Sequence, residues 1–89
     1  MPQRQVTIVN RRGLHARAAA KFVKLASGFD AQVVVEKEGM RVSGLSIMGL
    51  LMLAASPGSL VQIETEGESA SEALDALAGL VDSGFDETD

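Results

Sequence analysis

The segment Gln32–Ser43, QVVVEKEGMRVS, decides the fold because it predicts an antiparallel pair of strands. Residues 32–37 and 40–43 have the composition of strands and are separated only by Glu38-Gly39. A two-residue connection of this kind is typical of a β-hairpin, since the glycine can take the positive φ that a tight turn needs. The segment is the clearest hairpin signal in the chain and indicates an antiparallel sheet.

The chain on the N-terminal side of this hairpin predicts a strand followed by a helix. Residues 5–9 have strand composition and run into the turn signal of residues 10–13. From Ala16 onward, apolar residues recur at steps of three and four, which is typical of an amphipathic helix. We expect this helix to end at Gly28, with Phe29 placed for the hydrophobic contact of a glycine C-cap.

The chain on the C-terminal side of the hairpin predicts a helix, a strand and another helix. Ser46 is a typical N-cap for a short helix over residues 47 to about 53. Residues 60–66 alternate between apolar and polar side chains, as a half-buried strand does. Residues 69–72, SASE, match a capping box at the start of a last helix that ends near Gly84.

The predicted order of elements is βαββαβα, and it indicates the α+β class. The simplest architecture that fits this order is an open-faced two-layer sandwich, in which helices cover one face of a single antiparallel sheet. We expect one domain over residues 1–89, with a core over about 5–84 and a frayed acidic tail over 85–89.

The composition excludes several classes of function. Hydrophobic residues make up 46% of the 89 residues but aromatic residues only 3%, so the core is aliphatic and offers no stacking platform for nucleic acid. With no cysteine and one histidine, we expect no disulfide, no metal site and no cofactor. The apolar run 45–55 is too short to span a membrane, and no signal peptide is visible. We therefore expect a cytoplasmic protein with no membrane insertion.

Charge is divided unevenly along the chain. Six of the eight basic residues lie within the first 24 positions, whereas all twelve acidic residues lie at Asp30 or later, and the formal net charge is −4. An acidic protein with a local basic patch suits a small anion or an acidic protein surface better than a nucleic acid. The basic part of the chain surrounds the only histidine, His15.

His15 lies in GLHARAAA, residues 13–20, between the first turn and the start of a helix. There the backbone amides of Ala16, Arg17 and Ala18 lack partners within the helix and form an anion site. The Arg17 guanidinium adds planar donors for phosphate oxygens. A histidine at this place is suited to receive a phosphoryl group, and Gly13 lets the chain turn and leaves room for the phosphate. Acid–base catalysis by His15, or a purely structural role, are the alternatives.

The short helix that follows Ser46 is apolar around its whole circumference. A short helix on a small sheet buries only one side, so flexible apolar side chains are left as a binding face. With Leu50 and Leu53 in the core, the side chains left near solvent are Ile47, Met48 and either Leu51 or Met52. The alternative is that all of them pack in a thin core. Phosphorylation of Ser46 would place charge beside this face.

These motifs together resemble the HPr family, the histidine-containing phosphocarriers of the bacterial phosphoenolpyruvate-dependent phosphotransferase system. The resemblance lies in GLHAR at 13–17, SIMG at 46–49 and Pro57-Gly58, and it extends from about Gln5 to Val81. It implies four antiparallel strands covered on one face by three helices. It also implies that the protein is a carrier and not an autonomous enzyme, with phosphoenolpyruvate as the ultimate phosphoryl donor. We expect a monomer.

The resemblance further assigns roles to residues and partners. His15 would accept the phosphoryl group at Nδ1 from phosphorylated Enzyme I and pass it to an Enzyme IIA protein. Arg17 and the amides of residues 16–18 would hold the phosphate, and Ser46 would be the site of an HPr kinase/phosphorylase. Ala18 departs from the family, which usually has proline there. The docking face for both partners would consist of Ala20, Lys24, Ile47, Met48 and Leu51.

Three alternatives stay open at the level of sequence. One is a nitrogen-type or regulatory member of the same family, in a relay not coupled to sugar uptake. Another, from a different class, is a non-covalent protein-binding module that uses the face 47–52, with His15 only structural. A small hydrolase is the third.

Overall fold

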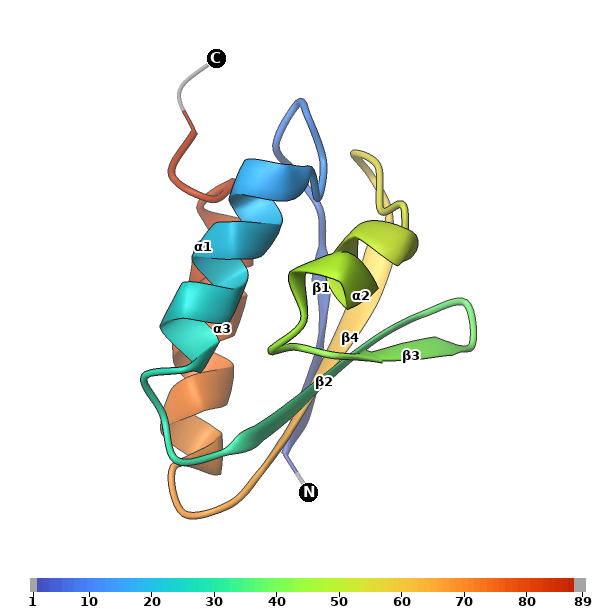
Figure 1. Ribbon diagram of the computed structural model, residues 1–89. Helices are drawn as coiled ribbons and strands as arrows, with labels where there is room; N and C mark the ends of the chain where they lie inside the picture. Colours follow the sequence, from blue (N-terminus) through green and yellow to red (C-terminus); the bar gives the residue numbers. More distant parts are fainter. Residues whose placement is uncertain (1, 88–89) are drawn as a thin grey trace.

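The computed structural model describes residues 2–87 and confirms the α+β fold predicted from the sequence (Figure 1). One antiparallel sheet with strand order β1-β4-β2-β3 forms one layer, and the helices form the other. The elements are, in chain order, β1 (Gln3–Thr7), α1 (Ala16–Ala26), β2 (Gln32–Lys37), β3 (Met40–Ser43), α2 (Ile47–Met52), β4 (Leu60–Glu66) and α3 (Ala70–Asp82). None of these helices is both long and apolar enough to cross a membrane.

The hairpin of β2 and β3 forms as predicted. Val34 pairs with Ser43 and Lys37 with Met40, which leaves Glu38-Gly39 as the connection. Both connecting residues have positive φ, 50° for Glu38 and 85° for Gly39, as a type I′ turn requires. The sheet is completed by β4, which lies between β2 and β1 and pairs antiparallel with both.

The core lies between the sheet and the three helices and is mostly aliphatic. Val6 and Ile8 face it from the N-terminal strand and are 5% and 1% exposed. The alanine-rich side of α1 and the leucine-rich side of α3 cover the sheet, and Phe22 of α1 is buried in the same core. Each large apolar side chain buried in this way stabilises the fold by about 1.5–3 kcal/mol. Small residues on α1 let this helix pack closely on a small sheet.

Two predicted helix ends are wrong. Gly28 does not take positive φ and so is not a glycine C-cap: α1 ends at Ala26, and the Ser27 amide bonds to the Val23 carbonyl and its hydroxyl to the Lys24 carbonyl, at 2.9 Å each. Ser69 precedes α3 but its side chain makes no capping bond. Its ψ of 27° is far from the extended conformation of an N-cap, so the predicted capping box does not form.

The first strand also lies two residues earlier than the predicted 5–9. Beyond Thr7 the pairing passes to the loop before β4, where the Ile8 amide donates to the Ser59 carbonyl at 2.9 Å. The next side chain, Val9, is 57% exposed. The alternation inferred for this segment is nevertheless confirmed, since Val6 and Ile8 are both buried.

The core continues past the predicted limit at residue 84. After α3, the Phe85 amide bonds to the Leu80 carbonyl and the Gly84 amide to the Val81 carbonyl, at 2.9 Å each. These two bonds and the φ of +70° at Gly84 define a Schellman motif. The motif turns Phe85 into the core, where it is fully buried. A frayed tail over 85–87 is therefore wrong, and residues 88–89 lie outside the described residues.

Candidate functional site

His15 is the N-cap residue of α1. Its backbone is extended, with φ −82° and ψ 179°, and its carbonyl accepts the first helical bond, from the Ala19 amide at 2.8 Å. The ring nitrogen Nδ1 accepts a hydrogen bond from the Arg17 amide at 3.2 Å. The imidazole thus occupies the place that a serine or aspartate oxygen usually takes at a helix start. The amides of Ala16, Arg17 and Ala18 lie in this first turn, before helical bonding begins.

The turn before His15 depends on Gly13 for the expected reason and for a second one. Gly13 has φ +68°, so the prediction that it lets the chain turn is confirmed. A Cβ there would lie 2.5 Å from the Ala55 carbonyl oxygen, so the chain itself fills the place where a side chain would begin, while room for a phosphate at Gly13 stays a prediction. That carbonyl accepts a hydrogen bond from the Leu14 amide at 2.9 Å. Glycine is needed because the backbone of residue 55 packs against it.

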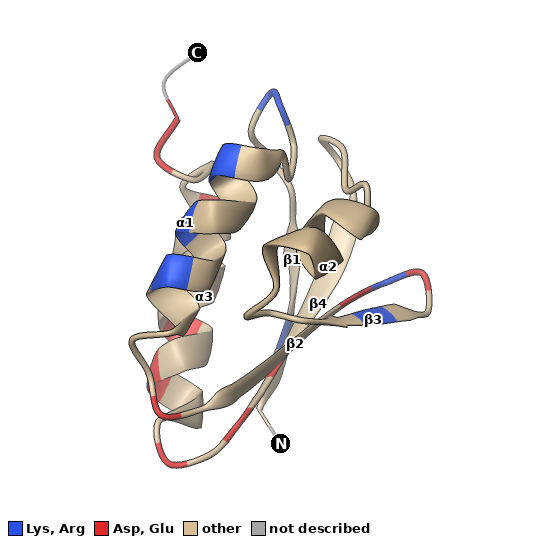
Figure 2. Cartoon of the chain, in the orientation of Figure 1, with Lys and Arg blue, Asp and Glu red and all other residues tan. Residues whose placement is uncertain are grey.

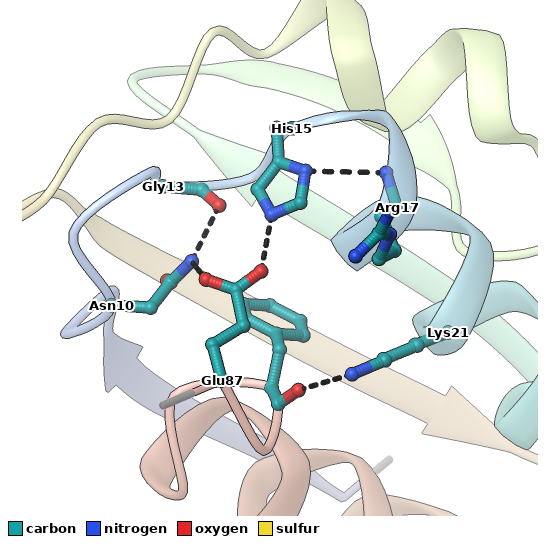
Figure 3. A network of polar contacts seen from close by, with 7 residues as sticks. Asn10, Gly13, His15, Arg17, Lys21 and Glu87 are labelled. Carbon is teal, nitrogen blue, oxygen red and sulfur yellow. Dashed lines mark hydrogen bonds and ion pairs between the residues drawn. The ribbon is translucent and has the colours of Figure 1, made fainter. Parts of the chain in front are cut away.

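The other ring nitrogen of His15 is held by a residue from the far end of the chain (Figure 3). Glu87 Oε2 hydrogen-bonds to His15 Nε2, while Glu87 Oε1 accepts from Asn10 Nδ2 at 2.9 Å. The same Asn10 nitrogen donates to the Gly13 carbonyl at 2.8 Å. Because both acceptors are oxygens, the amide of Asn10 has one favourable orientation. The network links the turn before α1, the imidazole and the C-terminal segment.

This network defines which nitrogen of His15 carries the proton. Nδ1 accepts from an amide N–H and therefore carries a lone pair and no proton, so in the neutral ring the proton lies on Nε2 and is donated to Glu87. The hydrogen bond from Asn10, together with the bond to His15, lowers the pKa of the Glu87 carboxyl. Glu87 is thus ionised at neutral pH, the form that accepts this hydrogen bond best.

The C-terminal segment is anchored on α1 by a lysine. Lys21 Nζ donates to the Phe85 carbonyl at 2.8 Å, and the Phe85 ring lies in the core. The Lys21 contact and the burial of Phe85 fix the backbone two residues before Glu87. The carboxylate therefore reaches His15 from an ordered turn.

The predicted basic patch and apolar face lie next to each other. Arg17, Lys21 and Lys24 follow one another along α1, whereas α2 carries no charged residue (Figure 2). The two helices pack against one another. Around the His15 end of α1 the molecule therefore offers cations beside an uncharged helix.

The short helix α2 exposes most of the residues expected from the sequence. Leu50 and Leu53 are buried, and the exposed fractions are 40% for Ile47, 71% for Met48 and 66% for Met52. Leu51 is half-buried and packs against the core. On α1, both Ala20 and Lys24 are exposed. The predicted surplus of apolar side chains on α2 is confirmed.

Two further predicted positions, Ser46 and Ala18, have clear structural roles. The Ser46 hydroxyl accepts from the Gly49 amide at 2.9 Å, so it is the N-cap of α2 as predicted. Ala18 is completely buried on the inner side of α1. Within residues 2–87, no three histidine, aspartate or glutamate side chains gather into a site that could hold a metal ion.

Sequence reasoning missed Asn10 and Glu87. Neither carries a signal of its own, because Glu87 bonds to Asn10 and to His15 across 77 and 72 residues of the chain. A signal was present in Gly84-Phe85, since a glycine followed by an apolar residue after a helix is typical of a Schellman motif. That motif predicts that the chain turns back toward the core, but it does not predict which residue the returning segment contacts.

Comparisons with known proteins agree with this geometry. The family model described as "PTS HPr component phosphorylation site" matches residues 2–83. The chain is 51% identical to a phosphocarrier protein HPr of Pseudomonas putida over 88 residues, or 98% of each chain. It is 47% identical to a phosphocarrier protein NPr of Shewanella violacea over 85 residues, 96% of this chain and 93% of that one. An HPr crystal structure from Thermoanaerobacter tengcongensis superposes with a TM-score of 0.94, at 43% identity and 99% coverage of both chains.

Proposed function

The chain belongs to the HPr family of phosphocarrier proteins, and from this premise we propose that His15 is the residue that carries the phosphoryl group. Members of the family are components of the phosphoenolpyruvate-dependent phosphotransferase system and not autonomous enzymes. They work between Enzyme I, the donor, and Enzyme IIA proteins, the acceptors. The proposal concerns which atoms of this chain perform that exchange.

The observation that carries the proposal is the lone pair of His15 Nδ1 at the start of α1. The Arg17 amide first releases its hydrogen bond to Nδ1. Nδ1 then attacks the phosphorus atom of the donor, the donor's bond to phosphorus breaks, and a phosphoramidate forms on the ring. The amides of Ala16, Arg17 and Ala18 and the Arg17 guanidinium then hold the phosphate oxygens, as donors at a helix N-terminus do. No side chain of this protein needs to remove a proton, because Nδ1 has none.

The second part of the proposal is a docking face shared by donor and acceptor. The face consists of exposed residues on α1 and α2, and its methionines adapt to differently shaped partners. Because both partners cover the same residues, the carrier leaves its donor before it meets its acceptor. The residues of the docking face are Ala20, Lys24, Ile47, Met48 and Leu51.

We also propose that phosphorylation of Ser46 by an HPr kinase/phosphorylase regulates docking. Ser46 is half-buried at the start of α2, next to Ile47 and Met48. A phosphate there adds a charge of about −1.5 to −2 beside an apolar face, which weakens docking. Ser46→Asp is expected to slow phosphoryl transfer from Enzyme I, whereas Ser46→Ala, which lacks the charge, is expected to keep most of it. Equal rates in the two variants would contradict this role.

A second candidate function is a regulatory relay of the nitrogen type. It is favoured by the similarity to the NPr of Shewanella violacea, whose 47% identity is close to the values found for relatives named HPr. The two functions differ in the acceptor. Transfer from the phosphorylated protein to a sugar-specific Enzyme IIA and to a nitrogen-type Enzyme IIA, measured side by side, decides between them by the faster rate.

The experiment that tests the main proposal uses phosphoenolpyruvate, Mg²⁺ and Enzyme I, with intact mass as the readout. One added phosphoryl group is expected on the wild-type protein and none on His15→Ala. The adduct should be labile in acid and stable in base, as a phosphoramidate is and a phosphoserine is not. A His15→Ala variant that still gains an acid-labile phosphoryl group would contradict the proposal.

A further inference from the structure

We propose that Glu87 is a positioning residue, which holds the proton on Nε2 of His15 while Nδ1 receives and releases the phosphoryl group. The inference deepens the proposed function and rests on it. The family motif GLHAR does not contain the group that bonds to the far ring nitrogen of His15, which is a carboxylate from the C-terminal segment.

The turn that places Glu87 beside His15 has an unusual backbone conformation. Gly84, Phe85 and Asp86 have φ values of +70°, +58° and +59°, and the Glu87 amide closes the turn on the Gly84 carbonyl at 3.1 Å. Phenylalanine rarely takes the left-handed region, and such a residue persists only where its surroundings hold it. Here the buried ring and the bond from Lys21 hold it. The chain therefore reverses at one defined place, directly beside His15.

Both oxygens of the Glu87 carboxylate are used. Oε1 accepts from Asn10, whose side chain is buried and is itself held by the Gly13 carbonyl, and Oε2 faces His15 Nε2. The side chains of His15 and Glu87 are only 22% and 12% exposed. A hydrogen bond shielded from water in this way is stronger than one on the open surface. Asn10 thus orients the carboxylate, and the carboxylate orients the ring.

The position of Glu87 leaves the docking face free. The C-terminal turn continues from α3 on the side of α1 away from α2 (Figure 1). Nδ1 points instead toward the first turn of α1 (Figure 3). A partner that covers α1 and α2 can therefore reach Nδ1 while Nε2 stays bonded to Glu87.

The chemistry needs the proton on Nε2 in both directions of transfer. When Nδ1 bonds to phosphorus, its lone pair forms the new bond, the proton stays on Nε2, and the ring becomes cationic beside the Glu87 carboxylate. When the phosphoryl group leaves, the electron pair of the N–P bond returns to Nδ1 and the ring leaves as neutral imidazole. With no proton on Nε2, the leaving group would be an imidazolate anion, which is far less favourable. Glu87 stabilises the protonated form in both steps.

The first test reads the tautomer of His15 without any partner protein. His15 is the only histidine, so a sample labelled with ¹⁵N-histidine gives the two ring nitrogens of this one residue. At a pH where the ring is neutral, the wild-type protein should show a protonated Nε2 and an unprotonated Nδ1. Glu87→Ala should shift the population toward a mixture, by a factor of about ten in the tautomer ratio, since a hydrogen bond to a charged group is lost.

Matched variants separate positioning from general effects of charge. Asp86→Asn removes one negative charge from the neighbouring residue, which bonds to Ser83 and not to His15, and should leave the tautomer unchanged. Glu87→Gln removes the charge but keeps an amide oxygen able to accept from Nε2, and should lie between wild type and Glu87→Ala. Thermal unfolding confirms that all three variants remain folded.

The second test measures the rate of phosphoryl acceptance from phosphorylated Enzyme I for the same proteins. The rate should fall about three- to tenfold in Glu87→Ala, less in Glu87→Gln and not at all in Asp86→Asn. If folded Glu87→Ala shows the ¹⁵N chemical shifts of the wild-type His15 ring, or accepts the phosphoryl group at the wild-type rate, the proposed role of Glu87 is overturned. A wild-type protein that takes no phosphoryl group onto His15 overturns the proposed function instead, so the two failures are distinguishable.

Discussion

The start of α1 and the end of α3 meet at the site, but they differ in how the backbone groups that lack helical partners are hydrogen-bonded. At the start of α1, His15 Nδ1 accepts from the Arg17 amide, and the other amides of the first turn precede the first helical bond, which the Ala19 amide makes. At the end of α3, the Schellman motif satisfies the last carbonyls within the chain itself. In the proposed function, the start of α1, which we call the open end, binds the phosphate, and the turn after α3, which we call the closed end, supports it. Substitutions can perturb each of these two ends separately.

The largest effect on stability is expected at the closed end, from Phe85→Ala. Phe85 is fully buried, and removing such a ring costs about 3–5 kcal/mol of the free energy of unfolding. Chemical denaturation measures this loss, with Phe29→Ala as the control because Phe29 is only half-buried and, unlike Phe85, does not have positive φ. Equal losses in the two variants would show that the turn after α3 is not part of the core.

At the open end, Arg17→Gln should reduce function without reducing stability. Arg17 is exposed, so the fold loses little, but the phosphate loses a charged donor. A charge-assisted hydrogen bond contributes about 1.5–3 kcal/mol, so phosphoryl acceptance should fall by about tenfold or more. Arg11→Gln removes an exposed charge from the preceding turn and serves as the control. The same loss in both variants would mean that Arg17 acts only through general charge.

Lowering the pH should break the contacts of Glu87, at the closed end, with His15 and Asn10 at the open end. The pKa of Glu87 is lowered by its hydrogen bonds, so the contact contributes stability above the pKa that Glu87 has when unfolded. That contribution is lost as the pH falls through the lowered value. The side-chain amide signal of Asn10 should therefore titrate below the usual range of a glutamate, and Glu87→Gln should abolish this transition. A midpoint in the usual range would show that the contact does not form in solution.

The smallest effect is expected from Ala18→Pro, which stiffens the open end. Proline is compatible with the first turn of a helix and restricts the unfolded chain, so we expect a gain of about 0.4–1 kcal/mol in the free energy of unfolding. Because proline lacks the N–H that alanine supplies, phosphoryl acceptance should fall slightly. An unchanged rate would show that the Ala18 amide does not bind the phosphate.

The open end could be predicted from the sequence because all of its parts are local. The turn, His15 and the first helical turn lie within the run 10–18, and the hairpin at Glu38-Gly39 is likewise defined by adjacent residues. The closed end could not be predicted in the same way. Its bond from Glu87 to His15 forms only after α3 has packed, and Asn10 takes part only because the fold buries it.

The wrong helix ends have a related cause. The sequence SASE before α3 matches a capping box, but the Ser69 amide bonds to the Asp30 carbonyl in the neighbouring loop, and the conformation of Ser69 is not that of a cap. Tertiary contacts overrode the local signal there. At Ser46, where the backbone is extended and free to cap, the local signal was sufficient.

The central claim is tested most directly by phosphorus and nitrogen NMR of the phosphorylated protein labelled with ¹⁵N-histidine. We predict a phosphorus–nitrogen coupling to Nδ1 of His15, together with a proton on Nε2. A phosphoryl group on Nε2, or on any residue other than His15, would contradict the account.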